Sequence, residues 1–184
     1  FSHLVSGLQT PTGEQNIAVW ELSRKVKASP VLTELIEKNE PLEILNSLGD
    51  SADGKKFKKD FDVFIRDFGH RGAEERDAYH FRWQQKPERV FPSIKALLAQ
   101  DDEDSPARFE ERLHLRMLET KKACLKKIRQ QPLGALKSAF FKWYLELVQE
   151  YFYFRDWERY QNDKNGVRRR PTYCAIGRRF VERG

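Results

Sequence analysis

Hydrophobic positions recur along this chain every three or four residues, which is the spacing of amphipathic helices. The pattern predicts helices at residues 14–28, 31–38, 41–48, 59–68, 92–100, 107–131, 135–161 and 172–183. No stretch shows the two-residue alternation of a half-buried strand. The sequence therefore predicts an all-α protein, built as a multi-helix bundle.

Polar and turn-forming residues separate the predicted helices. Residues 50–56 read as a polar turn, and Asp163-Lys164-Asn165-Gly166 as a turn before the last helix. The acidic segment 101–106 marks a candidate joint. This joint would divide the chain into two small helical subdomains, 1–100 and 107–184.

The predicted helix 135–161 is the most hydrophobic of the set. Its large apolar residues are Phe140, Phe141, Trp143, Tyr144, Leu147, Tyr151, Phe152, Phe154 and Trp157. Core packing is the ordinary interpretation and is favoured here, whereas the alternative is a cavity for a large apolar ligand. Because Trp143, Phe152, Phe154 and Trp157 do not share one helical face, some of them must meet another element, a ligand or another domain.

The candidate chemistry lies in residues 68–83, where Gly69 and Gly72 flank His70 and Arg71. Glycines suit a backbone that bends sharply or approaches a ligand closely. An imidazole can move protons near neutral pH, and a guanidinium can bind phosphate with two hydrogen bonds. The residue types therefore suit anion binding and proton transfer.

Two carboxylates follow in the same window, Glu75 and Asp77. They could orient the cations or act as a general base. The structural alternatives are a hydrogen-bonded turn histidine and carboxylates in a solvated turn or in salt bridges. A metal site would use His70, His80, Glu75 and Asp77, but their spacing fits no standard motif, and we predict none.

The charge balance favours anionic ligands, with 34 Lys and Arg against 28 Asp and Glu. Acidic and basic residues are mixed along 107–131, which argues against a nucleic-acid-binding domain. The basic residues Arg168–Arg170 and Arg178–Arg179 read as a solvated face. No phosphate-binding loop or nucleophile motif is present in the sequence.

The two cysteines, Cys124 and Cys174, show no metal-ligand spacing, which predicts free thiols in a reducing compartment. The chain has no run of 18 apolar residues and no signal-peptide pattern, so we expect a cytoplasmic protein without a membrane partner. The first residue is Phe, and we expect the chain to be part of a longer polypeptide.

Residues 68–83 resemble the signature YGHRGPGE-x-(D/E)…PRW in the central helical region of phosphoenolpyruvate-synthase-like phosphotransferases, the group that includes rifampicin phosphotransferase. The matching residues are Gly69, His70, Arg71, Gly72, Glu75, Asp77, Arg82 and Trp83. Residues 4–8 with 19–23, and residues 176–180, resemble the LLSGL…LWELA start and the LGRRL end of that region. Ala73-Glu74 stands where the family has Pro-Gly, and residues 162–171 are more polar than the family's continuous last helix.

The resemblance implies that residues 1–184 are one domain of a larger enzyme. An ATP-grasp domain would precede the chain, and a mobile phosphohistidine domain would follow it. ATP with Mg²⁺ would phosphorylate the histidine of the mobile domain, which would carry the phosphoryl group to a hydroxyl or enolate acceptor. The chain itself would hold no cofactor, and alone it would be inactive.

The resemblance also implies roles for the residues of this chain. Arg71 and Arg82 would stabilise the phosphoryl group, and His70, Glu75 or Asp77 would deprotonate a small-molecule acceptor. The acceptor pocket would be walled by Trp83, Phe140, Tyr144 and Tyr151. The alternative is a non-catalytic helical interaction module that uses the aromatic helix and the basic tail.

Overall fold

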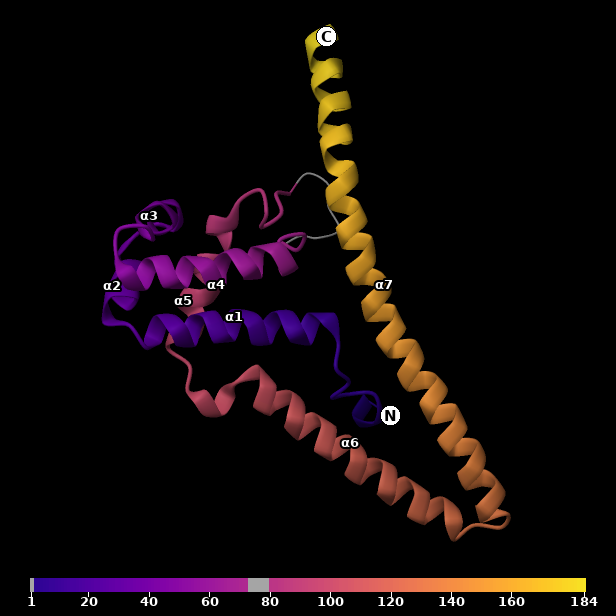
Figure 1. The fold of residues 1–184 in the computed structure, drawn as a ribbon. Helices are drawn as coiled ribbons and strands as arrows, with labels where there is room; N and C mark the ends of the chain where they lie inside the picture. Colours follow the sequence, from indigo (N-terminus) through magenta and orange to yellow (C-terminus); the bar gives the residue numbers. More distant parts are fainter. Residues whose placement is uncertain (1, 73–79) are drawn as a thin grey trace. The chain divides into compact units, whose positions relative to one another are not determined.

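The computed structural model describes residues 2–72 and 80–184, and every regular element within them is helical. The α-helices are α1 (Pro11–Lys27), α2 (Pro30–Lys38), α3 (Pro41–Ser47), α4 (Ala52–Phe68), α5 (Phe91–Leu98), α6 (Pro106–Arg129) and α7 (Gly134–Arg183) (Figure 1). Short 3₁₀ helices lie at Ser2–Leu4 (η1), Pro87–Val90 (η2) and Asp102–Asp104 (η3). The predicted all-α class is confirmed.

The chain forms two compact units, and each is assembled from two separate stretches of sequence. Unit 1 contains Phe1–Ile17 and Asp101–Arg159, and unit 2 contains Ala18–Gln100 and Tyr160–Gly184. The predicted joint after residue 100 coincides with one boundary. The helices α1 and α7 each contribute to both units, because the remaining boundaries fall inside them.

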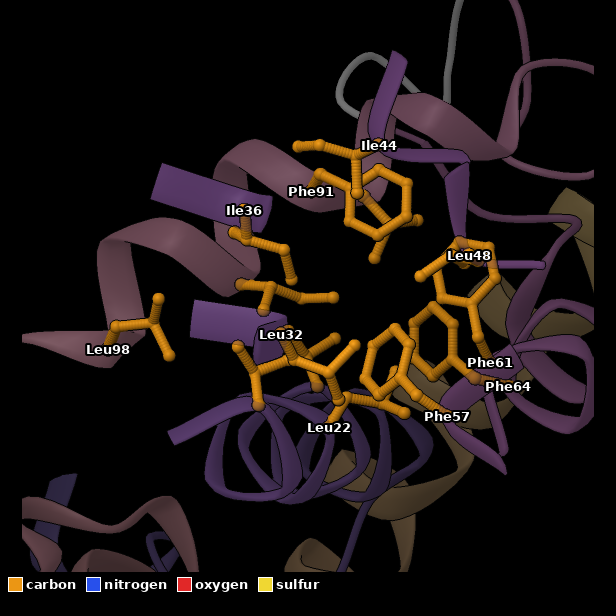
Figure 2. Close-up of a cluster of buried hydrophobic side chains, with 14 of the residues drawn as sticks. Leu22, Leu32, Ile36, Ile44, Leu48, Phe57, Phe61, Phe64, Phe91 and Leu98 are labelled. Carbon is orange, nitrogen blue, oxygen red and sulfur yellow. The ribbon is translucent and has the colours of Figure 1, made fainter. Parts of the chain in front are cut away.

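Unit 2 contains the main hydrophobic core, built from α1 to α5. Phe57, Phe61 and Phe64 lie one helical turn apart or nearly so on α4, and all three are buried. The ring of Phe61 stacks on Phe91 of α5, with 5.0 Å between ring centroids and 8° between planes. Figure 2 shows these rings pointing toward the aliphatic side chains of α2 and α3.

The helix α4 begins earlier than the sequence predicted, since residues 52–56 are helical rather than a turn. Ser51 caps it, and its hydroxyl accepts a hydrogen bond from the Gly54 amide at 2.9 Å. The residues that read as a polar turn form the first helical turns, with most of the polar side chains on the exposed side. The Ser51 cap therefore stabilises a helix in a segment whose polar residues had indicated a turn.

In unit 1, α7 packs through a narrow polar-apolar face. Leu145 and Ser138 are buried, and the Gln149 side-chain amide donates a hydrogen bond to the Leu4 carbonyl at 2.8 Å. Further along, the Asp156 carboxylate accepts a hydrogen bond from the Thr12 hydroxyl at 3.1 Å. These contacts fix the orientation of the helix around its own axis within the unit.

The opposite face of α7 carries an exposed apolar stripe. The sequence analysis favoured packing of these large apolar residues in the core, and that interpretation was wrong. The stripe consists of Leu136, Phe140, Trp143, Tyr144, Leu147, Tyr151 and Phe154, which are between 50% and 68% exposed. At about 100° per residue these positions fall within one face of a helix. The buried face of α7 consists instead of smaller and polar residues. The positions of the aromatic residues therefore did not indicate which face of the helix is packed.

The predicted turn at residues 163–166 and the separate last helix were also wrong, since α7 continues from Gly134 to Arg183. Pro171 lies inside it, although proline lacks the amide hydrogen that a helix interior uses. Contacts of this stretch within unit 2, described below, compensate for its weak helix propensity. In the described part of the chain, no helix has the length and apolar character needed to span a bilayer.

Candidate functional site

The candidate site begins where α4 ends at Phe68. The Gly69 amide donates to the Ile65 carbonyl at 2.7 Å and caps the helix. A Cβ atom on Gly69 would lie 2.1 Å from that carbonyl oxygen and 3.0 Å from the Cβ of Gln84. The backbone of Gly69 therefore lies close to other atoms of the protein itself, and only glycine fits at this position.

Two backbone hydrogen bonds join residues 69–71 to residues 83–84. The Trp83 amide donates to the Arg71 carbonyl at 2.9 Å, and the Gln84 amide donates to the Gly69 carbonyl at 2.8 Å. Trp83 also packs on Phe64, with ring centroids 5.6 Å apart, and belongs to the hydrophobic core. His70, Arg71 and Arg82 are consequently fixed to the core through their own backbone.

All three of these polar side chains are buried: His70 is 6%, Arg71 4% and Arg82 3% exposed. Buried cations and imidazoles are costly unless other groups compensate them. One carboxylate beside Arg71, that of Asp163, comes from α7, where the sequence had predicted a turn. The sequence window 68–83 therefore supplies only part of the site.

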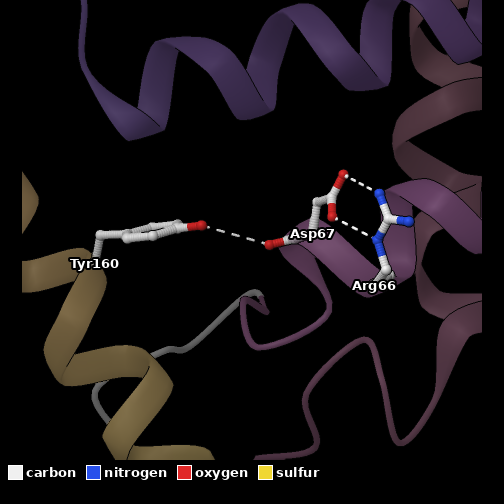
Figure 3. A network of polar contacts seen from close by, with 3 residues as sticks. All are labelled: Arg66, Asp67 and Tyr160. Carbon is white, nitrogen blue, oxygen red and sulfur yellow. Dashed lines mark hydrogen bonds and ion pairs between the residues drawn. The ribbon is translucent and has the colours of Figure 1, made fainter.

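The α7 residues Tyr160 and Asp163 contact the window. The ring of Tyr160 meets His70 edge-on, with centroids 4.6 Å apart and planes at 83°. A carboxylate oxygen of Asp163 lies 3.9 Å from an Arg71 guanidinium nitrogen, and both side chains are buried. The hydroxyl of Tyr160 donates to the Asp67 carbonyl at 3.4 Å, beside the Arg66–Asp67 ion pair (Figure 3).

Positive charge concentrates around His70. Lys164 lies over the Tyr160 ring, 4.3 Å from its centroid, and the window itself contributes Arg71 and Arg82. Burial first, and then the charges of Lys164, Arg71 and Arg82, lower the pKa of His70 to about 4. His70 is therefore neutral at pH 7, and its buried Nε2 atom has no hydrogen-bond partner among the residues that the structure describes.

A second group of cations surrounds the ring of Phe81, just before Arg82. Lys86, Arg89 and Arg170 lie 4.4, 5.7 and 4.7 Å from the ring centroid. Arg170 is buried, so the prediction of a wholly solvated basic face at 168–170 was wrong for this residue. Its position follows from the continuous helix, which turns Arg170 inward and leaves Arg168 and Arg169 exposed.

Several predicted site residues are not brought into this cluster. Glu75 and Asp77 lie outside the described residues, so the choice of base among His70, Glu75 and Asp77 stays open. Phe140, Tyr144 and Tyr151 are exposed residues of unit 1, and their role as walls of an acceptor pocket stays a prediction. Across residues 2–72 and 80–184, no three His, Cys, Asp or Glu side chains form a metal-binding group.

Sequence reasoning missed Tyr160, Asp163, Lys164 and Arg170. The available signal was their spacing, because residues three and four apart share one face of a helix. The Asp163–Gly166 run outweighed this signal, since Asp, Asn and Gly are common in turns.

The structure is that of an all-α domain in which a buried, neutral histidine lies near Arg71, Arg82 and Lys164, side chains of the type that bind anionic groups. A comparison with protein families gives the particular family. The family described as the rifampicin phosphotransferase fourth domain matches residues 1–156, and the chain belongs to this family. The predicted resemblance is confirmed.

The chain is also similar to a curated protein, the uncharacterized phosphotransferase YvkC of Bacillus subtilis (strain 168). The two are 24% identical over 87 residues, which are 47% of this chain and 10% of that protein. The matched segment is thus a small part of the relative's length. Together with the family, it makes this chain a domain of a phosphotransferase family.

Proposed function

We propose that the chain is the acceptor-binding domain of a dikinase-type phosphotransferase, in which ATP phosphorylates a histidine elsewhere in the polypeptide. The observation that supports this proposal is the site around His70. Its Nε2 atom is buried, lacks a hydrogen-bond partner within the described chain, and lies among three cationic side chains. A phosphoryl group in transfer carries negative charge that such cations stabilise.

In this proposal, Arg71 and Arg82 hold the phosphoryl group, and the neutral His70 accepts a hydrogen bond or a proton from the acceptor hydroxyl. A pKa near 4 makes His70 a weak base in the free site. A bound anion would offset the surrounding positive charge and raise that pKa toward neutrality. Anion binding would therefore activate the base, unless Glu75 or Asp77 takes the proton instead.

The remaining parts of the proposal concern the whole polypeptide. ATP and Mg²⁺ would act at an ATP-grasp domain, and a phosphohistidine domain would deliver the phosphoryl group to a small-molecule acceptor. Both domains would belong to the same polypeptide, which we place in the cytoplasm. The description of the family as a fourth domain supports the presence of further domains.

The test uses the full-length polypeptide with His70→Ala or Arg71→Ala. Each substitution should reduce phosphoryl transfer to the acceptor by at least about a hundredfold, the scale of one electrostatic or acid–base contribution. Phosphorylation of the histidine in the phosphohistidine domain by ATP should continue, because in this proposal His70 and Arg71 act only at the acceptor site. If transfer and histidine phosphorylation both keep their wild-type rates, the proposal is wrong.

A second candidate function is docking of another domain of the same polypeptide, and the exposed apolar stripe on α7 favours it. The same assay separates this role from an acceptor wall. If Phe140 forms part of the acceptor pocket, Phe140→Ser should raise the KM for the acceptor and change no other step. A docking role predicts that delivery from the phosphohistidine slows at every acceptor concentration.

A further inference from the structure

The family match ends at residue 156, whereas the site continues beyond it. Tyr160, Asp163 and Lys164 all follow the matched residues, and all three contact or face the His70–Arg71 pair. The spacing of three and four residues places them on one face of α7. This segment therefore supplies side chains to the site that the family match does not cover.

Asp163 is the most informative of the three. It is a carboxylate that is only 7% exposed, and its oxygen lies 3.9 Å from the Arg71 guanidinium. An acidic side chain beside an anion-binding site lowers the local positive potential. By its charge alone, Asp163 would therefore weaken anion binding. A geometric contribution would resolve this conflict, because a long arginine side chain loses rotamer freedom when it is held for binding.

We infer that Asp163 is a positioning residue, which holds the Arg71 guanidinium in the orientation that binds an anionic phosphoryl group. This inference rests on the proposed function of the same site. Asp163 acts through Arg71 and does not itself contact the phosphoryl group. Tyr160, about one turn earlier, contacts His70 through its ring, which shows that this face of α7 lies against the window.

The two accounts of Asp163 predict opposite signs. If Asp163 only neutralises charge, Asp163→Asn removes a negative charge and strengthens anion binding. If it positions Arg71, the same substitution removes the ion pair at 3.9 Å and weakens anion binding by about tenfold. The sign of the change distinguishes positioning from charge balance.

The experiment measures the affinity of the full chain for inorganic phosphate by calorimetric titration. Glu182→Gln is the matched control, because it removes one negative charge from an exposed position on the same helix. Far-ultraviolet circular dichroism verifies that each variant is folded. Asp163→Glu retains the charge and should keep much of the wild-type affinity. Asp163→Ser removes the same charge as the Asn variant and carries the test if that variant does not fold.

A double-mutant cycle with Arg71→Ala completes the test. Without Arg71 there is no guanidinium to position, so Asp163→Asn should no longer weaken phosphate binding. Equal or tighter binding by Asp163→Asn in the presence of Arg71 would overturn the positioning role and leave the proposed function intact. If the wild-type chain binds no phosphate and Arg71→Ala leaves transfer unchanged, the proposed function fails, and the positioning role fails with it.

Discussion

At the scale of single residues, His70 shows how surroundings set chemistry. An imidazole ordinarily titrates near neutral pH, but burial and the charges of Lys164, Arg71 and Arg82 lower the pKa of His70 to about 4. Burial, together with the same cations that we propose hold an anion, thus keeps this residue neutral at pH 7.

This shift predicts a pH-dependent loss of stability. Between pH 6.5 and about 4 the unfolded chain binds a proton at His70 that the folded chain does not. The free energy of unfolding should therefore fall as pH decreases through this range, by up to about 3 kcal/mol from this residue. Urea unfolding at several pH values should show a shallower decrease for His70→Gln, while His3→Gln retains the wild-type slope. Identical slopes in all three proteins would contradict the shift.

Two glycines give a second residue-scale prediction. A Cβ at Gly69 would lie 2.1 Å from the Ile65 carbonyl oxygen, whereas a Cβ at Gly166 would meet nothing within 4 Å. Gly69→Ala should therefore destabilise the protein by about 1–3 kcal/mol. Gly166→Ala should stabilise it by up to about 1 kcal/mol, because alanine has the higher helix propensity. Thermal unfolding of both variants measures the contrast, and a harmless Gly69→Ala would exclude the close approach.

At the scale of elements, α7 is the helix that the sequence described least well. Its stripe of large aromatic residues is exposed, and its buried face contains Ser138, Leu145 and Gln149. Within unit 2 its polar continuation contributes Asp163 and Arg170, which are buried. Amphipathic spacing located faces of this helix, but it did not reveal which face is packed.

The packed face can be tested by truncation. Leu145→Ala should lower the free energy of unfolding by about 2–5 kcal/mol, since it removes a buried side chain and leaves a cavity. Phe140→Ala, on the exposed stripe, should change it by no more than about 0.5 kcal/mol although more atoms are removed. Urea unfolding of the two variants gives the comparison. The reverse order would mean that the stripe is the packed face.

At the scale of the whole molecule, the chain belongs to the family described as the rifampicin phosphotransferase fourth domain. We expect residues 1–184 alone to convert no ATP, because the proposed ATP-grasp and phosphohistidine domains lie outside them. The measurement is AMP formation by this chain beside the full-length polypeptide, with acceptor present in both. AMP formation by the chain alone, at a rate that further purification does not reduce, would contradict the proposal that ATP is converted by other domains.

The sequence determined the helical class and the apolar positions of most helices, because three- and four-residue hydrophobic spacing is local information. It also located Gly69, His70, Arg71, Arg82 and Trp83 in one window, through residue types and family resemblance. Only the tertiary structure decided that Tyr160, Asp163 and Lys164 complete the site. Those residues are about 90 positions away in sequence, and their local composition favours a turn. Packing against the buried window, which no local pattern encodes, compensates for that weak propensity and keeps α7 helical through the site.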